Sequence, residues 1–153
     1  MGQQQLLLLV LSTVIVGLAT VAGIQAFSEN QAQASQDALV QRGTSIASDI
    51  QGLAGKPSQM GGVDLSSSGS ASASGIVDKL GYETESGSDT KVTAEGAGGG
   101  ASCTIGEPSS GSLTITCSSG NAPQDVKVTV TPANSSVSGS DVVSTEFVDS
   151  SSS

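Results

Sequence analysis

The feature that most constrains this chain is a run of apolar residues from Leu6 to Phe27. The run contains no charged side chain, and its polar members are Ser12, Thr13, Thr20 and Gln25. A helix of roughly 20 such residues is long enough to span the hydrocarbon layer of a membrane. Because the run is apolar on every side, a helix formed by it must be surrounded by lipid or by protein.

The helical pattern continues after the apolar run, with a different character. From Ser28 onward, apolar side chains recur at helical spacing along one stripe, and Gln, Ser, Asp and Glu occupy the other faces. The stripe consists of Ala38, Leu39, Ile46, Ile50 and Leu53. Gly55 and Pro57 form a stop signal. We predict one helix over about residues 2–54, roughly 75 Å long, in which Gly43 is a weak point that costs about 1 kcal/mol relative to Ala.

The C-terminal third of the chain shows the alternation that is typical of β-strands. Cys103 and Ile105 alternate with polar residues, and so do Ile115 and Cys117. If Cys103 lies opposite Cys117 in an antiparallel pair, Ile105 lies opposite Ile115 and both pairs share one face. The residues between the two strands, 107–111, are suited to a turn.

We predict that Cys103 and Cys117, the two cysteines of the chain, form a structural disulfide. A closed loop of about fifteen residues contributes roughly 3 kcal/mol in the chain-entropy description. The alternative is a redox-active pair, but such pairs are usually C-x-x-C motifs or lie beside cations. A disulfide also indicates an oxidising compartment outside the cytoplasm.

Together these patterns predict an α+β fold, with a long N-terminal helix followed by a small antiparallel β-sheet domain that holds one disulfide. Four regions follow from the composition: an apolar helix, 1–27; its amphipathic continuation, 28–55; a Ser/Gly-rich linker region with short elements, 56–100; and an antiparallel β domain, 101–153. The linker region contains a short helix or strand at 76–80. The β domain contains further strands at 126–130 and 142–148.

Composition argues against several classes of function. The net charge is −9, and all five Lys and Arg residues lie at or after Arg42, so no basic patch suits nucleic acid. The absence of histidine removes the commonest general base and metal ligand. Four acidic residues lack the spacing of a calcium loop, and we interpret them as a solvated patch: Glu83, Glu85, Asp89 and Glu95. We expect neither an enzyme nor a cofactor or metal.

The N-terminal flank of the apolar run is uncharged, which is unusual for an export signal or a membrane anchor. We therefore expect that a basic leader has been removed from the chain. Three amides, Gln3, Gln4 and Gln5, directly precede the run. They either cap the helix at the bilayer surface or form hydrogen bonds with neighbouring subunits near the filament axis, because an unpaired amide is costly in an apolar core.

Small residues within the run are candidates for helix packing. Ala19 and Gly23 are four residues apart, a spacing that lets two helices approach closely. Gly17 lies two residues before Ala19. In the C-terminal region, Asn134 begins an Asn-Ser-Ser sequence that matches the sequon for N-glycosylation.

These N-terminal residues resemble the start of bacterial type IV pilin-like proteins. The resemblance is carried by the block MGQQQLLLLVL at 1–11, by VIVGLA at 14–19 and by Gly23-Ile24, and it extends through the polar helix to about residue 55. It implies that a prepilin peptidase removes a basic leader and that the new N-terminal residue, here Met1, is often methylated. It also implies an inner-membrane assembly machinery that moves the subunit from the membrane into a filament.

One position departs from the pattern of that family. Most type IV pilins carry a glutamate at the fifth mature position, which is thought to pair with the terminal amine of a neighbouring subunit. Gln5 stands at this position if Met1 is the first mature residue, and its neutral amide accepts a hydrogen bond but brings no charge. If processing followed Gly2, Leu7 would stand there and could not pair.

The apolar run and the resemblance favour a structural subunit of an extracellular, type IV pilus-like filament on a prokaryotic cell surface. Such a subunit resides in the cytoplasmic membrane before assembly and then associates with copies of itself. The main alternative is a single-pass membrane protein that displays a small β binding domain. A third interpretation is a secreted soluble protein whose first 26 or 34 residues are a signal, since Ala32-Gln33-Ala34 resembles a cleavage site.

Overall fold

The computed structural model of the chain describes residues 2–65, 71–132 and 142–149. Its elements in chain order are α1 (Gly2–Ala54), a 3-10 turn η1 (Ser58–Met60), α2 (Ala73–Leu80), β1 (Lys91–Thr93), β2 (Ser102–Ile105), β3 (Leu113–Ser118), β4 (Asp125–Val130) and β5 (Val143–Val148). The strands form one antiparallel sheet in the order β1-β2-β3-β4-β5. The predicted α+β fold is therefore confirmed.

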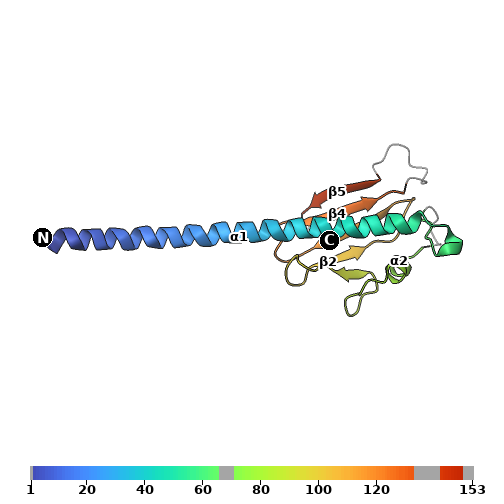
Figure 1. Ribbon diagram of the computed structural model, residues 1–153, viewed down its shortest axis with the longest axis horizontal. Coiled ribbons are helices and arrows are strands. Elements are labelled where there is room, and N and C mark those ends of the chain that lie inside the picture. Colours follow the sequence, from blue (N-terminus) through green and yellow to red (C-terminus); the bar gives the residue numbers. More distant parts are fainter. Residues whose placement is uncertain (1, 66–70, 133–141, 150–153) are drawn as a thin grey trace.

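Helix α1 is 53 residues long and is used in two different ways (Figure 1). Its first part, residues 2–34, projects from the domain and contains no buried residue; we call it the exposed half. Its second part, residues 35–54, crosses the sheet; we call it the packed half. The helix ends where the sequence predicts, with the backbone N–H of Gly55 donating to the carbonyl oxygen of Gln51 at 2.9 Å.

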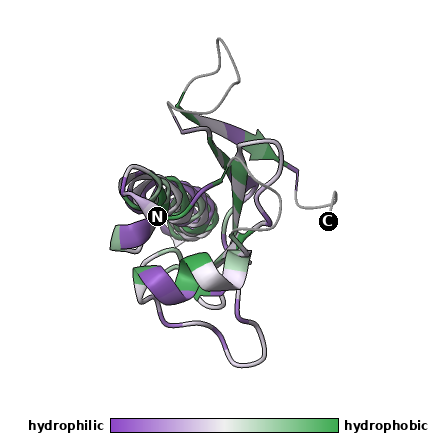
Figure 2. Ribbon diagram, turned by 90° about the vertical axis from the view of Figure 1, so that its right-hand side faces the viewer, coloured by the Kyte–Doolittle hydropathy of each residue, from purple (hydrophilic) through white to green (hydrophobic). Residues whose placement is uncertain are grey.

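The core lies between the packed half of α1 and one face of the sheet. The buried residues of α1 recur at helical spacing and are Ser35, Leu39, Gly43, Ile46, Ala47, Ile50 and Leu53. They meet the alternate residues of the central strands, such as Ile115 of β3 and Val128 of β4, which are fully buried. Viewed along α1, α2 lies beside both the helix and the sheet (Figure 2), and its Ile76 and Val77 are buried in the core.

The pairing of β2 with β3 confirms the predicted register. Cys103 lies opposite Cys117 and Ile105 lies opposite Ile115. The two cysteines form a disulfide, and both are fully buried beneath α1. The turn that joins the strands is tight, and Gly111 has a φ of +79°, a left-handed conformation that glycine adopts without strain.

The expectation from helix propensity that Gly43 is a weak point of α1 is corrected by its packing. A Cβ atom at this position would lie 2.9 Å from Cγ2 of Val128 and 3.3 Å from Sγ of Cys117. The absence of a side chain therefore lets α1 sit directly on the sheet above the disulfide. The residue that weakens the helix as an isolated element is required by its packing, because tertiary contacts override intrinsic propensity.

The linker region contains the 3-10 turn η1, helix α2 and strand β1. The short element predicted at 76–80 is helix α2, whose N-terminus is capped by the Ser72 hydroxyl accepting from the backbone N–H of Gly75 at 3.2 Å. Strand β1 was not predicted, because its three residues bury one side chain, Val92, and are too few to show an alternating pattern. The strands predicted at 126–130 and 142–148 are confirmed as β4 and β5.

Candidate assembly surface

The exposed half of α1 is a large apolar surface that nothing in the described domain covers. Its thirteen large apolar side chains are each between 53% and 72% exposed: Leu6, Leu7, Leu8, Leu9, Val10, Leu11, Val14, Ile15, Val16, Leu18, Val21, Ile24 and Phe27. Monomeric soluble proteins rarely expose a contiguous apolar patch of this extent. Within the described residues, α1 is also the one helix long and apolar enough to cross a membrane.

These side chains surround the helix instead of forming one stripe. Successive residues of an α-helix are about 100° apart, so the four leucines at 6–9 already cover the full circumference. A surface of this kind cannot be covered by a single flat partner. It requires an apolar surrounding on all sides, either lipid or several protein neighbours.

The three hydroxyl groups of the apolar run, on Ser12, Thr13 and Thr20, bond within the helix. Ser12 donates to the carbonyl oxygen of Leu9 at 2.9 Å, and Thr13 donates to that of Val10 at 2.8 Å. Thr20 donates to the carbonyl oxygen of Gly17 at 2.8 Å. Since the donors are satisfied within the helix, the polar residues of the run can enter an apolar environment without an unpaired O–H group.

The residues that the sequence singles out for assembly lie on this exposed half. Gln3, Gln4 and Gln5 are exposed at its start. Added Cβ atoms at Gly17 and Gly23 would meet no atom within 4 Å, so both glycines face open space. Ala19 and Gly23 share one face of the helix, as residues four apart do. Met1 and the candidate glycosylation site Asn134 lie outside the described residues.

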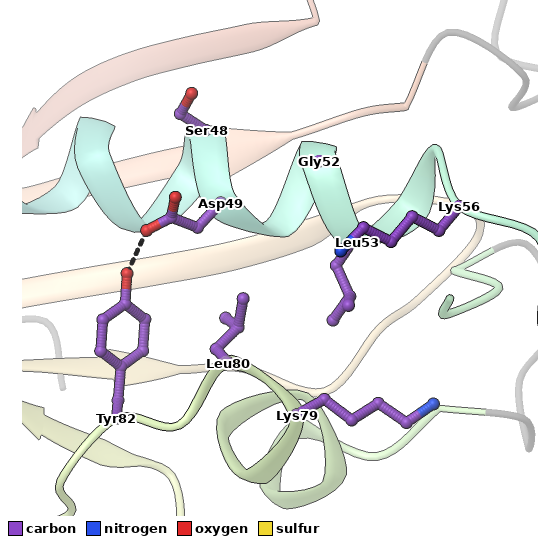
Figure 3. Close-up of a pocket in the computed structure, with 8 residues that line it drawn as sticks. All are labelled: Ser48, Asp49, Gly52, Leu53, Lys56, Lys79, Leu80 and Tyr82. Atoms are coloured by element: carbon purple, nitrogen blue, oxygen red, sulfur yellow. Dashed lines mark hydrogen bonds between the residues drawn. The ribbon is translucent and has the colours of Figure 1, made fainter. Parts of the chain in front are cut away.

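A groove lies at the opposite end of α1, beside α2 (Figure 3). It is lined by Ser48, Asp49, Gly52, Leu53, Lys56, Lys79, Leu80 and Tyr82. The Tyr82 hydroxyl donates a hydrogen bond to the Asp49 carboxylate, and the Arg42 guanidinium lies 5.1 Å from the centroid of the Tyr82 ring. Burial, together with the hydrogen bond and the negative charge of Asp49, raises the pKa of Tyr82 to about 12. Tyr82 therefore remains neutral at physiological pH and ties the loop after α2 to α1.

Sequence reasoning did not identify this groove. Tyr82 is the one tyrosine in a chain with 2% aromatic residues, and this rarity was the available signal. Its partners Arg42 and Asp49 are 40 and 33 positions away, and no pattern along the chain links them to Tyr82. Of the two lysines of the groove, Lys56 follows the end of α1 and Lys79 lies in α2, so they are likewise brought together by tertiary structure alone.

The four acidic residues interpreted as a solvated patch are all exposed. Glu85 forms an ion pair with Lys91 at 2.8 Å. Across the residues that the structure describes, no group of three or more His, Cys, Asp or Glu side chains is arranged to hold a metal ion. The acidic side chains thus face solvent along the loop between α2 and β1 and along the turn that follows β1.

Comparison with protein-family models, with curated proteins and with solved structures found no match. Two physical properties of the chain bear on where it resides. The apolar half of α1 is able to anchor the chain in a membrane. The disulfide between Cys103 and Cys117 is typical of an oxidising compartment outside the cytoplasm.

Proposed function

We propose that this chain is a structural subunit of an extracellular, type IV pilus-like helical filament on a prokaryotic cell. The observation that supports this proposal is the uncovered apolar half of α1, attached without a break to a folded β domain. In the proposed filament the exposed halves pack lengthwise into a central core. The acidic domains form the outer layer, where their charge keeps them solvated.

The free energy gained by covering the exposed half favours contact with several neighbouring subunits over contact with one. Covering a Leu, Ile, Val or Phe side chain fully is worth about 1.5–3 kcal/mol, and thirteen such side chains are exposed around the whole helix. A closed dimer would leave most of this surface in water. Copies that pack side by side with an axial shift form heterologous contacts, which repeat into an open helical polymer.

The same surface accounts for a membrane stage before assembly. A bilayer surrounds a single helix on all sides, as the neighbouring helices of the filament would do later. Prepilin peptidase and an inner-membrane assembly machinery are the partners that this route requires. In the filament, Gln5 would accept a hydrogen bond from the N-terminal amine of a neighbouring subunit, in place of the usual charged pair.

The test is electron microscopy and sedimentation of material sheared from cells that express the chain, with N-terminal mass analysis of the same sample. We expect long polymers whose subunits begin at a processed and methylated residue. Recovery of the chain solely as detergent-solubilised monomers would contradict the proposal. That result would favour the alternative, a single-pass membrane protein that displays a β domain.

A further inference from the structure

We infer that the groove of Figure 3 binds an acidic loop from a second copy of this chain. The groove contains Lys56 and Lys79, and we call it the lysine groove. The loop comprises residues 83–89, between α2 and β1, and we call it the acidic loop. The inference rests on the proposed filament and adds to it a specific contact between globular domains.

The lysine groove is positively charged in a chain whose net charge is −9. Lys56 follows the end of α1 and Lys79 lies in the last turn of α2, and both are exposed. Lys79 donates one hydrogen bond, to the carbonyl oxygen of Gly62 at 3.2 Å. Within the described part of the chain, neither lysine lies within 4 Å of a carboxylate. The carboxylate that lines the groove, Asp49, already accepts the hydrogen bond of Tyr82.

The basic residues outside the lysine groove each lie beside a particular side chain of the same subunit. Arg42 lies over the ring of Tyr82, and Lys91 pairs with Glu85. Lys127 lies opposite Glu146 in the β4–β5 pair, on the face of the sheet away from α1. The lysine groove therefore combines two cations that are exposed, close to one cavity and without an acidic partner in the described residues.

The acidic loop is ordered and presents its charges outward. The backbone N–H of Glu85 donates to the carbonyl oxygen of Lys91 at 2.9 Å, and that of Ser88 donates to Glu85 at 3.0 Å. Gly87 allows the turn with a φ of +95°. Glu83 and Asp89 are exposed on either side of this turn. In Figure 1 the loop extends away from the body of the domain, so a second molecule is able to reach it.

Opposite charges on two different surfaces of one chain make a directional contact. Because the lysine groove and the acidic loop are different surfaces, each copy can bind one neighbour through its groove and another through its loop, the heterologous contact from which an open polymer is built. Subunits of equal negative charge repel one another, so the pairing of a positive with a negative surface also selects one relative orientation. Both properties suit an open polymer.

The test compares filaments of the wild type with those of the double variant Lys56→Gln/Lys79→Gln. We expect the fraction of protein that sediments as polymer at low salt to fall about three- to tenfold, the size expected for two exposed ion pairs. The difference should disappear at about 1 M salt, where screening acts over about 3 Å. Lys127→Gln is the matched control, since it removes a lysine from the far face of the sheet and should leave the polymer fraction unchanged.

A charge exchange identifies the partner of the groove. Lys56→Glu/Lys79→Glu and Glu83→Lys/Asp89→Lys should each assemble poorly, and an equal mixture of the two variants should recover assembly. Equal polymer fractions for Lys56→Gln/Lys79→Gln and Lys127→Gln would overturn the inference while leaving the filament intact. Absence of polymer in the wild type would instead overturn the proposed function, and the contact with it.

Discussion

The two halves of α1 share one secondary structure and have opposite environments. In the packed half, Leu39 and Ile46 are fully buried against the sheet. In the exposed half, Leu11 is 57% exposed, and no side chain is buried. A continuous helix is therefore not stabilised by the same kind of contact along its whole length. The packed half is stabilised within the subunit, and the exposed half must be stabilised by lipid or by other subunits.

The largest expected effects come from removing one leucine from each half. Leu39→Ala should lower the free energy of unfolding of the domain by about 2–5 kcal/mol, because it leaves a cavity in the core. Leu11→Ala should change that free energy by less than about 0.5 kcal/mol but reduce the yield of polymer. Denaturant unfolding in detergent measures the first quantity and sedimentation measures the second. Equal destabilisation by both variants would show that the exposed half is covered within the subunit.

The next effect concerns the close approach of the packed half to the sheet. Gly43→Ala should destabilise the domain by about 1–2 kcal/mol, because overpacking against Val128 outweighs the gain in helix propensity. Gly52→Ala is the matched control on the same helix, since an added Cβ there meets no atom within 4 Å. It should stabilise the domain by about 0.5–1 kcal/mol. Thermal unfolding of both variants checks the difference in sign.

A smaller effect should come from the hydrogen bond between Tyr82, which precedes the acidic loop, and Asp49 of the packed half. Tyr82→Phe removes the hydrogen bond to Asp49 and should cost about 0.5–1.5 kcal/mol near pH 7. The pKa of Tyr82 is raised in the folded state to about 12 from the ordinary 10.0, so the unfolded chain loses this proton first as the pH rises. The stabilisation is complete below pH 10 and declines between pH 10 and 12. Unfolding measured across this range should show the decline in the wild type and its absence in Tyr82→Phe.

The smallest effect is predicted in the exposed half. Thr20→Val should leave both domain stability and polymer yield nearly unchanged, because the Thr20 hydroxyl bonds to the carbonyl oxygen of Gly17 within its own helix. The comparison variant is Thr20→Lys, which places a charge in the apolar surface and should abolish assembly. A loss of polymer in Thr20→Val would show that the hydroxyl bonds to a neighbouring subunit.

Periodicity along the chain predicted much of the fold. The spacing of apolar residues and the signal at Gly55 and Pro57 predicted the bounds of α1, and alternation predicted the Cys103–Cys117 register. These features depend on the 3.6-residue and two-residue repeats, which are properties of local backbone geometry. Strand β1 was not predicted, because its three residues contain a single buried position and so cannot show an alternating pattern.

The candidate sites divide in the same way. The exposed half of α1 could be predicted from the sequence, because a helix that is apolar on every side must be shielded from water whatever its neighbours are. The lysine groove could not be predicted from the sequence, because Lys56 and Lys79 line one groove only after α2 has folded against the end of α1. The sequence by itself thus determined a long helix, a disulfide-linked hairpin and an apolar surface that must be covered. Only the tertiary structure showed why residue 43 is glycine, which residues Tyr82 contacts and where two lysines line one groove. Each of these features depends on contacts between residues that are far apart in the sequence.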